Sequence, residues 1–297
     1  MEQQPALTPE TLAERLIAWM ASRPPVAVAF SGGIDSTVVA YAAHAAHPER
    51  AVAVTADSPS VARSELADAI RLAELIGIRH RIIHTDEFAN PDYLRNDGSR
   101  CYHCKATLYD HLARLLPELG VELIVSGANA DDLGDYRPGL TAAAERGVRH
   151  PLVELGLGKA AVRRLARGWG LPTWDKPAAP CLASRLAPGV AVTAERTRRV
   201  ELAEALLREL GVRECRIRLH ADELARIEVP PDQLARLASD GVRPVLLQRL
   251  QALGFRYVTL DLAGFRSGSF NQLIDLDVRQ RFLAKPHPQA NAQERAT

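Results

Sequence analysis

The chain lacks the features of a membrane, secreted or nucleic-acid-binding protein. No apolar run is long enough to cross a bilayer, and residues 1–5 show neither the basic region nor the apolar stretch that opens a secretory signal. The 37 Lys and Arg residues are matched by 36 Asp and Glu, so the basic excess of a dedicated nucleic-acid binder is missing. We therefore expect a cytoplasmic protein with neither a membrane nor a nucleic-acid partner.

Cysteine is also scarce. Four cysteines in 297 residues are too few for a disulfide framework. In a reducing compartment, metal-binding, redox or nucleophilic roles suit such residues better. The sequence around each cysteine therefore has to indicate its role.

The first half of the chain alternates short apolar runs with amphipathic stretches. The predicted strands are 26–30, 51–55, 81–84 and 122–126, and the predicted helices are 8–22, 37–47, 60–76, 105–115 and 159–169. Unbroken apolar runs are typical of strands buried on both faces. This alternation predicts an α/β fold built on a doubly wound parallel sheet.

A proline-rich segment, 171–180, cannot continue any regular element and predicts a domain boundary. Beyond it, helices are predicted at 194–210 and 232–253, and strands at 215–219, 225–229 and 257–261. We expect a smaller C-terminal α+β domain there. The predicted division is an N-terminal helix (1–22), an ATP-binding domain (23–175), a domain for substrate binding and oligomerisation (176–284) and a disordered tail (285–297).

A phosphate-binding loop, residues 31–36, follows the first predicted strand. Gly32 and Gly33 lie between a buried strand and a helix, where backbone N–H groups and the positive end of the helix dipole attract an anion. Ser31 and Ser36 add hydroxyl donors, and Asp35 beside the phosphates implies Mg²⁺. The lysine of a Walker loop and the third glycine of a dinucleotide fingerprint are both missing. The bland alternative is a glycine turn that enters a helix.

A second polar segment, 126–132, follows another predicted strand. In an open sheet the carboxyl ends of the strands meet at one crevice, so we expect Gly127 beside the nucleotide. Asp131 and Asp132 would hold Mg²⁺ there, close to Asp35. A solvated acidic loop is the alternative.

Cys101 and Cys104 form a Cys-x-x-Cys pair in a loop that opens a helix. Thiolates at this spacing chelate a metal or form a redox disulfide. A structural zinc site would have to borrow ligands such as His103 or Cys181, whereas three cysteines with one open position suit an iron-sulfur cluster. Cys215 lies in a predicted strand and is expected in the core.

Cys181 comes directly after the proline-rich segment, where two domains would meet. Arg185 nearby would favour the thiolate form that a nucleophile or sulfur donor requires. An ordinary buried cysteine is the alternative for Cys181 taken by itself.

Three motifs in this order resemble the LarE family, which is part of the PP-loop superfamily. They are the loop 31–36, the segment 127–139 and the segment 181–185, and the likeness runs from about residue 27 to residue 272. The resemblance implies an ATP pyrophosphatase fold, homo-oligomers and ATP-dependent sulfur insertion for the nickel-pincer nucleotide cofactor. It further implies that ATP adenylates a carboxylate of pyridinium-3,5-biscarboxylate mononucleotide and that catalytic Cys181 attacks the acyl-adenylate, leaving its sulfur as a thiocarboxylate.

The resemblance leaves two sulfur sources. In the sacrificial version Cys181 ends as dehydroalanine. Family members with the additional cysteine pair resemble a subgroup in which three cysteines hold a [4Fe-4S] cluster whose extra sulfide is donated. Cys101, Cys104 and Cys181 match that pattern, so we expect the cluster rather than sacrifice, with zinc or a redox disulfide as the alternatives.

The implied substrate carries a phosphate and two carboxylates, which clustered guanidinium groups bind well. The candidates are Ser184, Arg185, Arg216, Arg218 and Arg266. Arg216 and Arg218 alternate along a predicted strand and so share one face. A solvated strand face is the alternative.

Three other functions compete with sulfur insertion. An amidating synthetase of the NAD or GMP synthetase type would use ammonia and would not need Cys181. A tRNA thiolase would need a basic groove, against which the balanced charge speaks. A nucleotide sensor would bind ATP without hydrolysing it.

Overall fold

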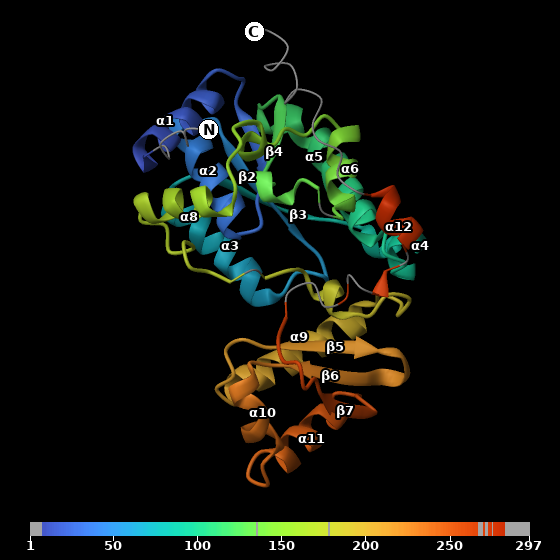
Figure 1. The fold of residues 1–297 in the computed structure, drawn as a ribbon. Coiled ribbons are helices and arrows are strands. Elements are labelled where there is room, and N and C mark those ends of the chain that lie inside the picture. The colour runs from blue at the N-terminus through green and yellow to red at the C-terminus, as the bar shows by residue number, and fades with distance from the viewer. Residues whose placement is uncertain are drawn as a thin grey trace, which may run out of the picture.

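The computed structural model describes residues 8–134, 136–177, 179–266, 270, 273–274 and 276–282 (Figure 1). Two sheets organise these residues: four strands in the order β3-β2-β1-β4, and three in the order β5-β6-β7. Each sheet has its own helices, and Figure 1 shows the two units one above the other. The predicted α/β class with a smaller second unit is confirmed.

All neighbouring strands of the first sheet are parallel. They are β1 (Val26–Ala29), β2 (Val52–Asp57), β3 (Arg79–His84) and β4 (Leu123–Ser126). β1 lies between β2 and β4 and is almost completely buried, which explains its unbroken apolar run. Because the strands are parallel, the loops that follow β1, β2 and β4 lie at one edge of the sheet.

Helices cover both faces of this sheet. They are α1 (Pro9–Ala21), α2 (Ile34–Ala46), α3 (Arg63–Ile76), α4 (Pro91–Arg95), α5 (Arg100–Leu119), α6 (Pro138–Glu145), α7 (Pro151–Glu154) and α8 (Lys159–Gly168). One core joins the sheet to α1, α2, α3 and α8, and a second core joins its other face to α5 and α6. The unit is thus a three-layer sandwich.

The second unit packs helices on its own sheet. Its elements are α9 (Ala194–Glu209), β5 (Arg216–His220), β6 (Leu224–Glu228), α10 (Pro231–Ala238), α11 (Arg243–Ala252) and β7 (Tyr257–Leu260). β5 and β6 are antiparallel, whereas β6 and β7 are parallel. Tyr93 of α4 is buried in this second core, so the two units interlock.

Three predicted helix limits are wrong. The single helix predicted at 232–253 is two helices, α10 and α11, because Ser239 has an extended backbone (φ −68°, ψ 155°) and ends α10. α5 begins at Arg100, so the cysteine pair lies in its first two turns and not in a loop before it. α3 begins at Arg63, which leaves residues 60–62 free to form the loop after β2.

The chain returns to the first unit after β7. α12 (Leu276–Arg281) lies beside α4 and α6 in Figure 1, and Phe282 packs 5.8 Å from the Tyr102 ring and 6.4 Å from the Tyr136 ring. Among the described residues, no helix combines the length and the apolar character needed to span a membrane. The tail predicted at 285–297 lies outside the described residues, and the domain limits stay a prediction.

Candidate active site

The loop after β1 is shaped to receive an anion. Gly32 has φ +69°, and a β-carbon there would lie 3.1 Å from the backbone of Ala69. Gly33 precedes α2 without a side chain to cap it, so the first N–H groups of the helix face the loop. The Ser36 hydroxyl donates to Gly33 O at 3.1 Å and lies 3.2 Å from the Ser31 hydroxyl. The loop therefore holds its two hydroxyl groups and the helix N-terminus together.

The loop after β4 packs directly on this phosphate loop. A β-carbon on Gly127 would lie 2.6 Å from Ser36 N and 2.8 Å from the carbonyl carbon of Asp35, which only glycine allows. Asn129 Nδ2 donates to Asp35 Oδ1 at 3.0 Å. Burial raises the pKa of Asp35 although the Asn129 bond lowers it, and the charge of Asp132 raises it further. A divalent cation would stabilise two such carboxylates, and this fits the predicted Mg²⁺.

Asp131 has a structural contact of its own. Its Oδ2 accepts the N–H of Lys159 at 2.7 Å and so caps α8 from a distant part of the chain. A β-carbon on Gly158 would lie 2.7 Å from Asp131 Oδ1. Within the described residues no three His, Cys, Asp or Glu side chains are arranged to hold a metal ion. Magnesium binding by Asp35 and Asp131 therefore stays a prediction.

Cys181 lies at the same edge of the sheet. It is exposed and directly precedes the short helix η3 (Leu182–Arg185). Leu182 N donates to Ser60 O at 2.8 Å, which ties the Cys181 loop to the loop after β2. The Ser60 hydroxyl is in turn hydrogen-bonded to the hydroxyl of Tyr93. The two loops and α4 thus hold the cysteine close to the strand end.

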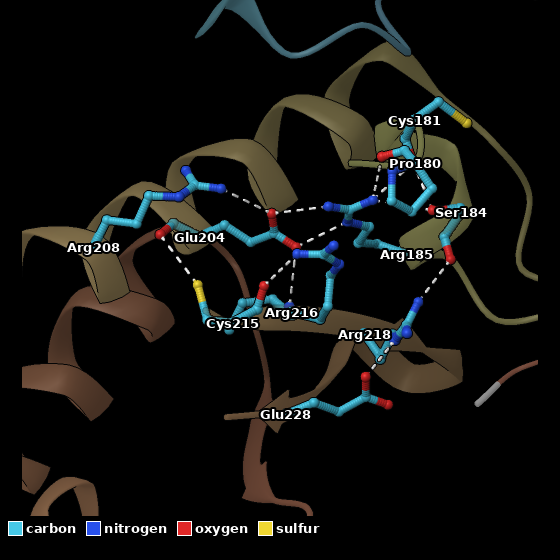
Figure 2. Close-up of polar contacts among 11 residues, drawn as sticks. Pro180, Cys181, Ser184, Arg185, Glu204, Arg208, Cys215, Arg216, Arg218 and Glu228 are labelled. Carbon is cyan, nitrogen blue, oxygen red and sulfur yellow. Dashed lines mark hydrogen bonds and ion pairs between the residues drawn. The ribbon is translucent and has the colours of Figure 1, made fainter. Parts of the chain in front are cut away.

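Arg185 binds the backbone of the Cys181 loop (Figure 2). Its guanidinium group binds Glu204 through Nε at 2.9 Å and Nη2 at 3.3 Å, and the two side chains are 4% and 1% exposed. Nη1 donates to the carbonyls of Pro180 and of Cys181, the latter at 3.2 Å. The Cys181 thiol points away from the guanidinium group in Figure 2. The expected approach of Arg185 to the thiol is therefore not what the structure shows, because its donors are directed at Glu204 and at carbonyls.

Two of the predicted substrate residues lie on one face of β5. Arg216 and Arg218 share that face, as their alternation predicts. Arg218 donates to Glu228 Oε2 at 2.9 Å and to Ser184 O at 3.1 Å, and Arg216 lies over the Phe265 ring. The Ser184 hydroxyl donates to Cys181 O at 2.7 Å, and Arg185 binds Glu204 beside it. Arg266 is exposed.

Repulsion among Arg185, Arg216 and Arg218 favours the binding of an anion between them. Burial lowers the pKa of Arg216, and the neighbouring charges of Arg185 and Arg218 lower it further. Burial also lowers the pKa of Arg218, which Glu228 partly offsets. A phosphate or carboxylate placed near Arg216 would relieve both effects.

The cysteine pair faces the Cys181 loop. Cys101 is exposed and Cys104 is half-buried, and burial raises the pKa of Cys104 to about 12. The charges of Cys101 and Cys181 both act on the Cys104 thiol, so the three thiols border one region. Within the described residues these three thiols are not arranged as a metal-binding group, so the iron-sulfur cluster stays a prediction. Cys215 is 1% exposed and lies in the second core, as predicted.

Comparisons with known proteins agree with this geometry. The family model for asparagine synthase matches residues 9–173. A pyridinium-3,5-bisthiocarboxylic acid mononucleotide synthase from Lactiplantibacillus plantarum is 36% identical over 260 residues, which are 87% of this chain and 93% of that protein. The chain belongs to the LarE family. It is an ATP-dependent sulfur transferase whose first unit is of the ATP pyrophosphatase type.

Two further relatives of this LarE protein are uncharacterized. One from Synechocystis sp. is 48% identical over 247 residues, which are 83% of this chain and 92% of that protein. One from Methanocaldococcus jannaschii is 25% identical over 242 residues, which are 82% of this chain and 91% of that protein.

One residue of the site has no role assigned from the sequence alone. Asn129 lies inside the predicted motif, but only the fold shows that it reaches Asp35. Asp132, which the sequence offers as a magnesium ligand, acts on Asp35 through its charge. An open cavity of about 560 Å³ also lies where the ends of β2 and β3 meet α9. Asp57, Ser58, Arg63, His84, Arg198 and Glu201 are among its lining residues. No local pattern signals this cavity, since its walls come from distant segments.

Substitution of Gly127 tests the contact between the two loops. In Gly127→Ala the new β-carbon would displace the backbone of Asp35 and Ser36, so we expect ATP-dependent pyrophosphate release to fall at least about tenfold. Gly241→Ala is the control, because a β-carbon there meets nothing within 4 Å. Wild-type rates in Gly127→Ala would contradict the expected clash.

Thiol alkylation tests the described environments of the cysteines. Burial raises the pKa of Cys104 to about 12 and that of Cys215 to about 11, so at pH 8 both form less of the reactive thiolate. In reduced protein stripped of iron, iodoacetamide should modify exposed Cys101 and Cys181 at least about tenfold faster, as peptide mapping by mass spectrometry would show. The four rates should converge in denaturant. Rapid native alkylation of Cys104 would show that this thiol is not buried as described.

Proposed function

We propose that this LarE protein converts a carboxylate of pyridinium-3,5-biscarboxylate mononucleotide into a thiocarboxylate, with ATP as the activating reagent. The relative from L. plantarum is named for a bisthiocarboxylic acid mononucleotide product. The observation that carries the proposal is the exposed Cys181, held by Ser60 at the sheet edge that also carries the phosphate loop. An amidating synthetase would have no use for a thiol at this place.

Activation would take place at the phosphate loop. A substrate carboxylate oxygen attacks the α-phosphorus of ATP, pyrophosphate leaves, and an acyl-adenylate forms. Ser31, Gly32, Gly33 and Ser36 bind the phosphates in this proposal, beside Gly127. Mg²⁺ near Asp35 and Asp131 would neutralise the leaving pyrophosphate.

Sulfur transfer would follow at Cys181. Its thiolate attacks the acyl carbon, AMP leaves, and a thioester joins the substrate to the protein. In the sacrificial route a base removes the α-proton of Cys181 and the Cβ–S bond breaks. The sulfur then departs with the bonding electrons as the thiocarboxylate, and dehydroalanine remains. No oxidant or reductant is needed.

In the alternative that we favour, Cys101, Cys104 and Cys181 hold a [4Fe-4S] cluster. The cluster would supply an extra sulfide as the thiocarboxylate sulfur, AMP would leave as before, and inorganic sulfide would replace the donated sulfur, so the protein would stay intact. The cysteine pair supports this choice because a purely sacrificial donor needs only one thiol. The position of both pair members next to the Cys181 loop adds to that support.

The anionic substrate would bind on the arginine face of the second unit. Arg216 and Arg218 lie next to the Ser184 segment, and Arg185 holds the same loop. Arg266, which is exposed, would complete the set. We also propose a homo-oligomer, as the family resemblance implies.

Replacement of Cys181 separates activation from sulfur transfer. In Cys181→Ala we expect sulfur transfer to fall at least about a hundredfold, while substrate-dependent pyrophosphate release stays within about twofold of wild type. Cys215→Ala is the matched control, because that thiol lies in the core. Product formation at the wild-type rate in Cys181→Ala would defeat the proposal.

Iron analysis separates the cluster from sacrifice. Protein purified without oxygen should contain about four iron and four acid-labile sulfide per chain. When inorganic sulfide is supplied, it should keep its mass through many turnovers. Cys101→Ala and Cys104→Ala should lose the iron, whereas Cys215→Ala should retain it. Colourless protein that loses one sulfur atom from Cys181 per turnover would establish sacrifice instead.

A further inference from the structure

Asn96 joins the segment that carries the cysteine pair to the Cys181 loop. It ends α4, is 3% exposed, and has φ +54°, in a region that residues other than glycine seldom adopt. A buried residue in such a conformation persists only where its contacts stabilise it. Those contacts show what Asn96 holds in place.

The Asn96 side chain clamps the turn that follows η3. Its Nδ2 lies 2.9 Å from Ala187 O, 3.0 Å from Val190 O and 3.3 Å from Leu186 O. Its backbone oxygen accepts from Gly189 N at 2.9 Å. One buried amide thereby fixes the turn that begins just after the Cys181 segment.

Arg100 extends this clamp to the cysteine pair. Its Nη1 donates to Asn96 Oδ1 at 2.8 Å and to Ala183 O at 2.7 Å. Its Nη2 lies 3.7 Å from the Cys101 sulfur. A guanidinium group is planar and rigid, so contacts at its two ends fix the distance between the groups they touch. Arg100 therefore bridges Cys101 and the loop two residues after Cys181.

We infer that Arg100, held by Asn96, is a positioning residue that sets the spacing between the Cys181 thiol and the Cys101 and Cys104 thiols. The inference rests on the proposed sulfur transfer. Sulfur transfer needs these thiols in a fixed arrangement, and a shift of about 1 Å costs on the order of a hundredfold in rate. Within the described part of the chain, Arg100 and Asn96 make no hydrogen bond to the phosphate loop, so ATP activation should not depend on them.

Cross-linking measures this spacing directly. Dibromobimane becomes fluorescent when it joins two thiols, and peptide mapping identifies the pair. In the full chain, stripped of iron and reduced, we expect wild type to cross-link Cys181 to Cys101 or Cys104. Arg100→Gln should lower both this cross-linking and sulfur transfer at least about tenfold, with pyrophosphate release within about twofold of wild type. Arg100→Lys should give intermediate cross-linking and sulfur transfer, because lysine keeps the positive charge but lacks the planar guanidinium group that binds two partners at once.

Two further variants complete the test. If Arg100→Gln does not fold, Asn96→Gly tests the positioning role instead. Glycine tolerates the positive φ of this residue, so the substitution removes only the side-chain amide that holds the turn. It should show the same split between transfer and pyrophosphate release. Arg95→Gln is the control, since Arg95 is an exposed arginine of the same segment that pairs with Asp92.

Three results would overturn the inference. One is a wild-type chain that does not cross-link. Another is cross-linking and transfer that survive unchanged in Arg100→Gln and Asn96→Gly. The third is a parallel loss of pyrophosphate release, which would make Arg100 a general support of the fold. If cross-linking depends on Arg100 but no variant or wild type transfers sulfur, the positioning role stands and the proposed function fails.

Discussion

The buried pair of Arg185 and Glu204 governs the position of the Cys181 thiol. Both side chains are almost completely shielded from water, and the same guanidinium group binds the carbonyl oxygens of Pro180 and Cys181. Removal of one partner of a buried pair typically costs about 3–5 kcal/mol, because the other charge is left without compensation. The loop is consequently held firmly while the thiol itself stays exposed.

A second constraint brings this thiol to the nucleotide site. The first sheet is parallel, so the loops after β1, β2 and β4 emerge at one edge. Gly127 lets the β4 loop touch the phosphate loop, and Ser60 in the β2 loop binds the Cys181 segment. Activation and sulfur delivery can therefore take place at neighbouring points, although the phosphate loop and Cys181 lie more than a hundred positions apart in the chain.

Charge is distributed unevenly in a chain whose formal net charge is only +1. Carboxylates gather near the phosphate loop, where burial and repulsion raise the pKa of Asp35. Arginines gather on β5, where burial and repulsion lower the pKa of Arg216. Each region thus favours a counter-ion of the opposite sign, a divalent cation in the first and a substrate anion in the second.

The sequence by itself determined the fold class, the phosphate loop and the family, because these depend on local patterns. An unbroken apolar run indicates a buried strand, and two glycines between a strand and a helix indicate an anion site. It was less successful where local patterns are ambiguous. Residues 232–253 look helical throughout, but the chain turns at Ser239.

Only the tertiary structure decided what the polar side chains contact. Arg185 is an arginine near a thiol in the sequence, yet in the fold it binds Glu204 and backbone carbonyls. Asp131 caps α8. Asn96 and Arg100 join two cysteine-bearing segments, and the hydrogen bond from Arg100 to Ala183 O spans 83 positions of the sequence. The physical reason is that a hydrogen bond depends on distance and direction in space, which the order of residues along a chain does not fix.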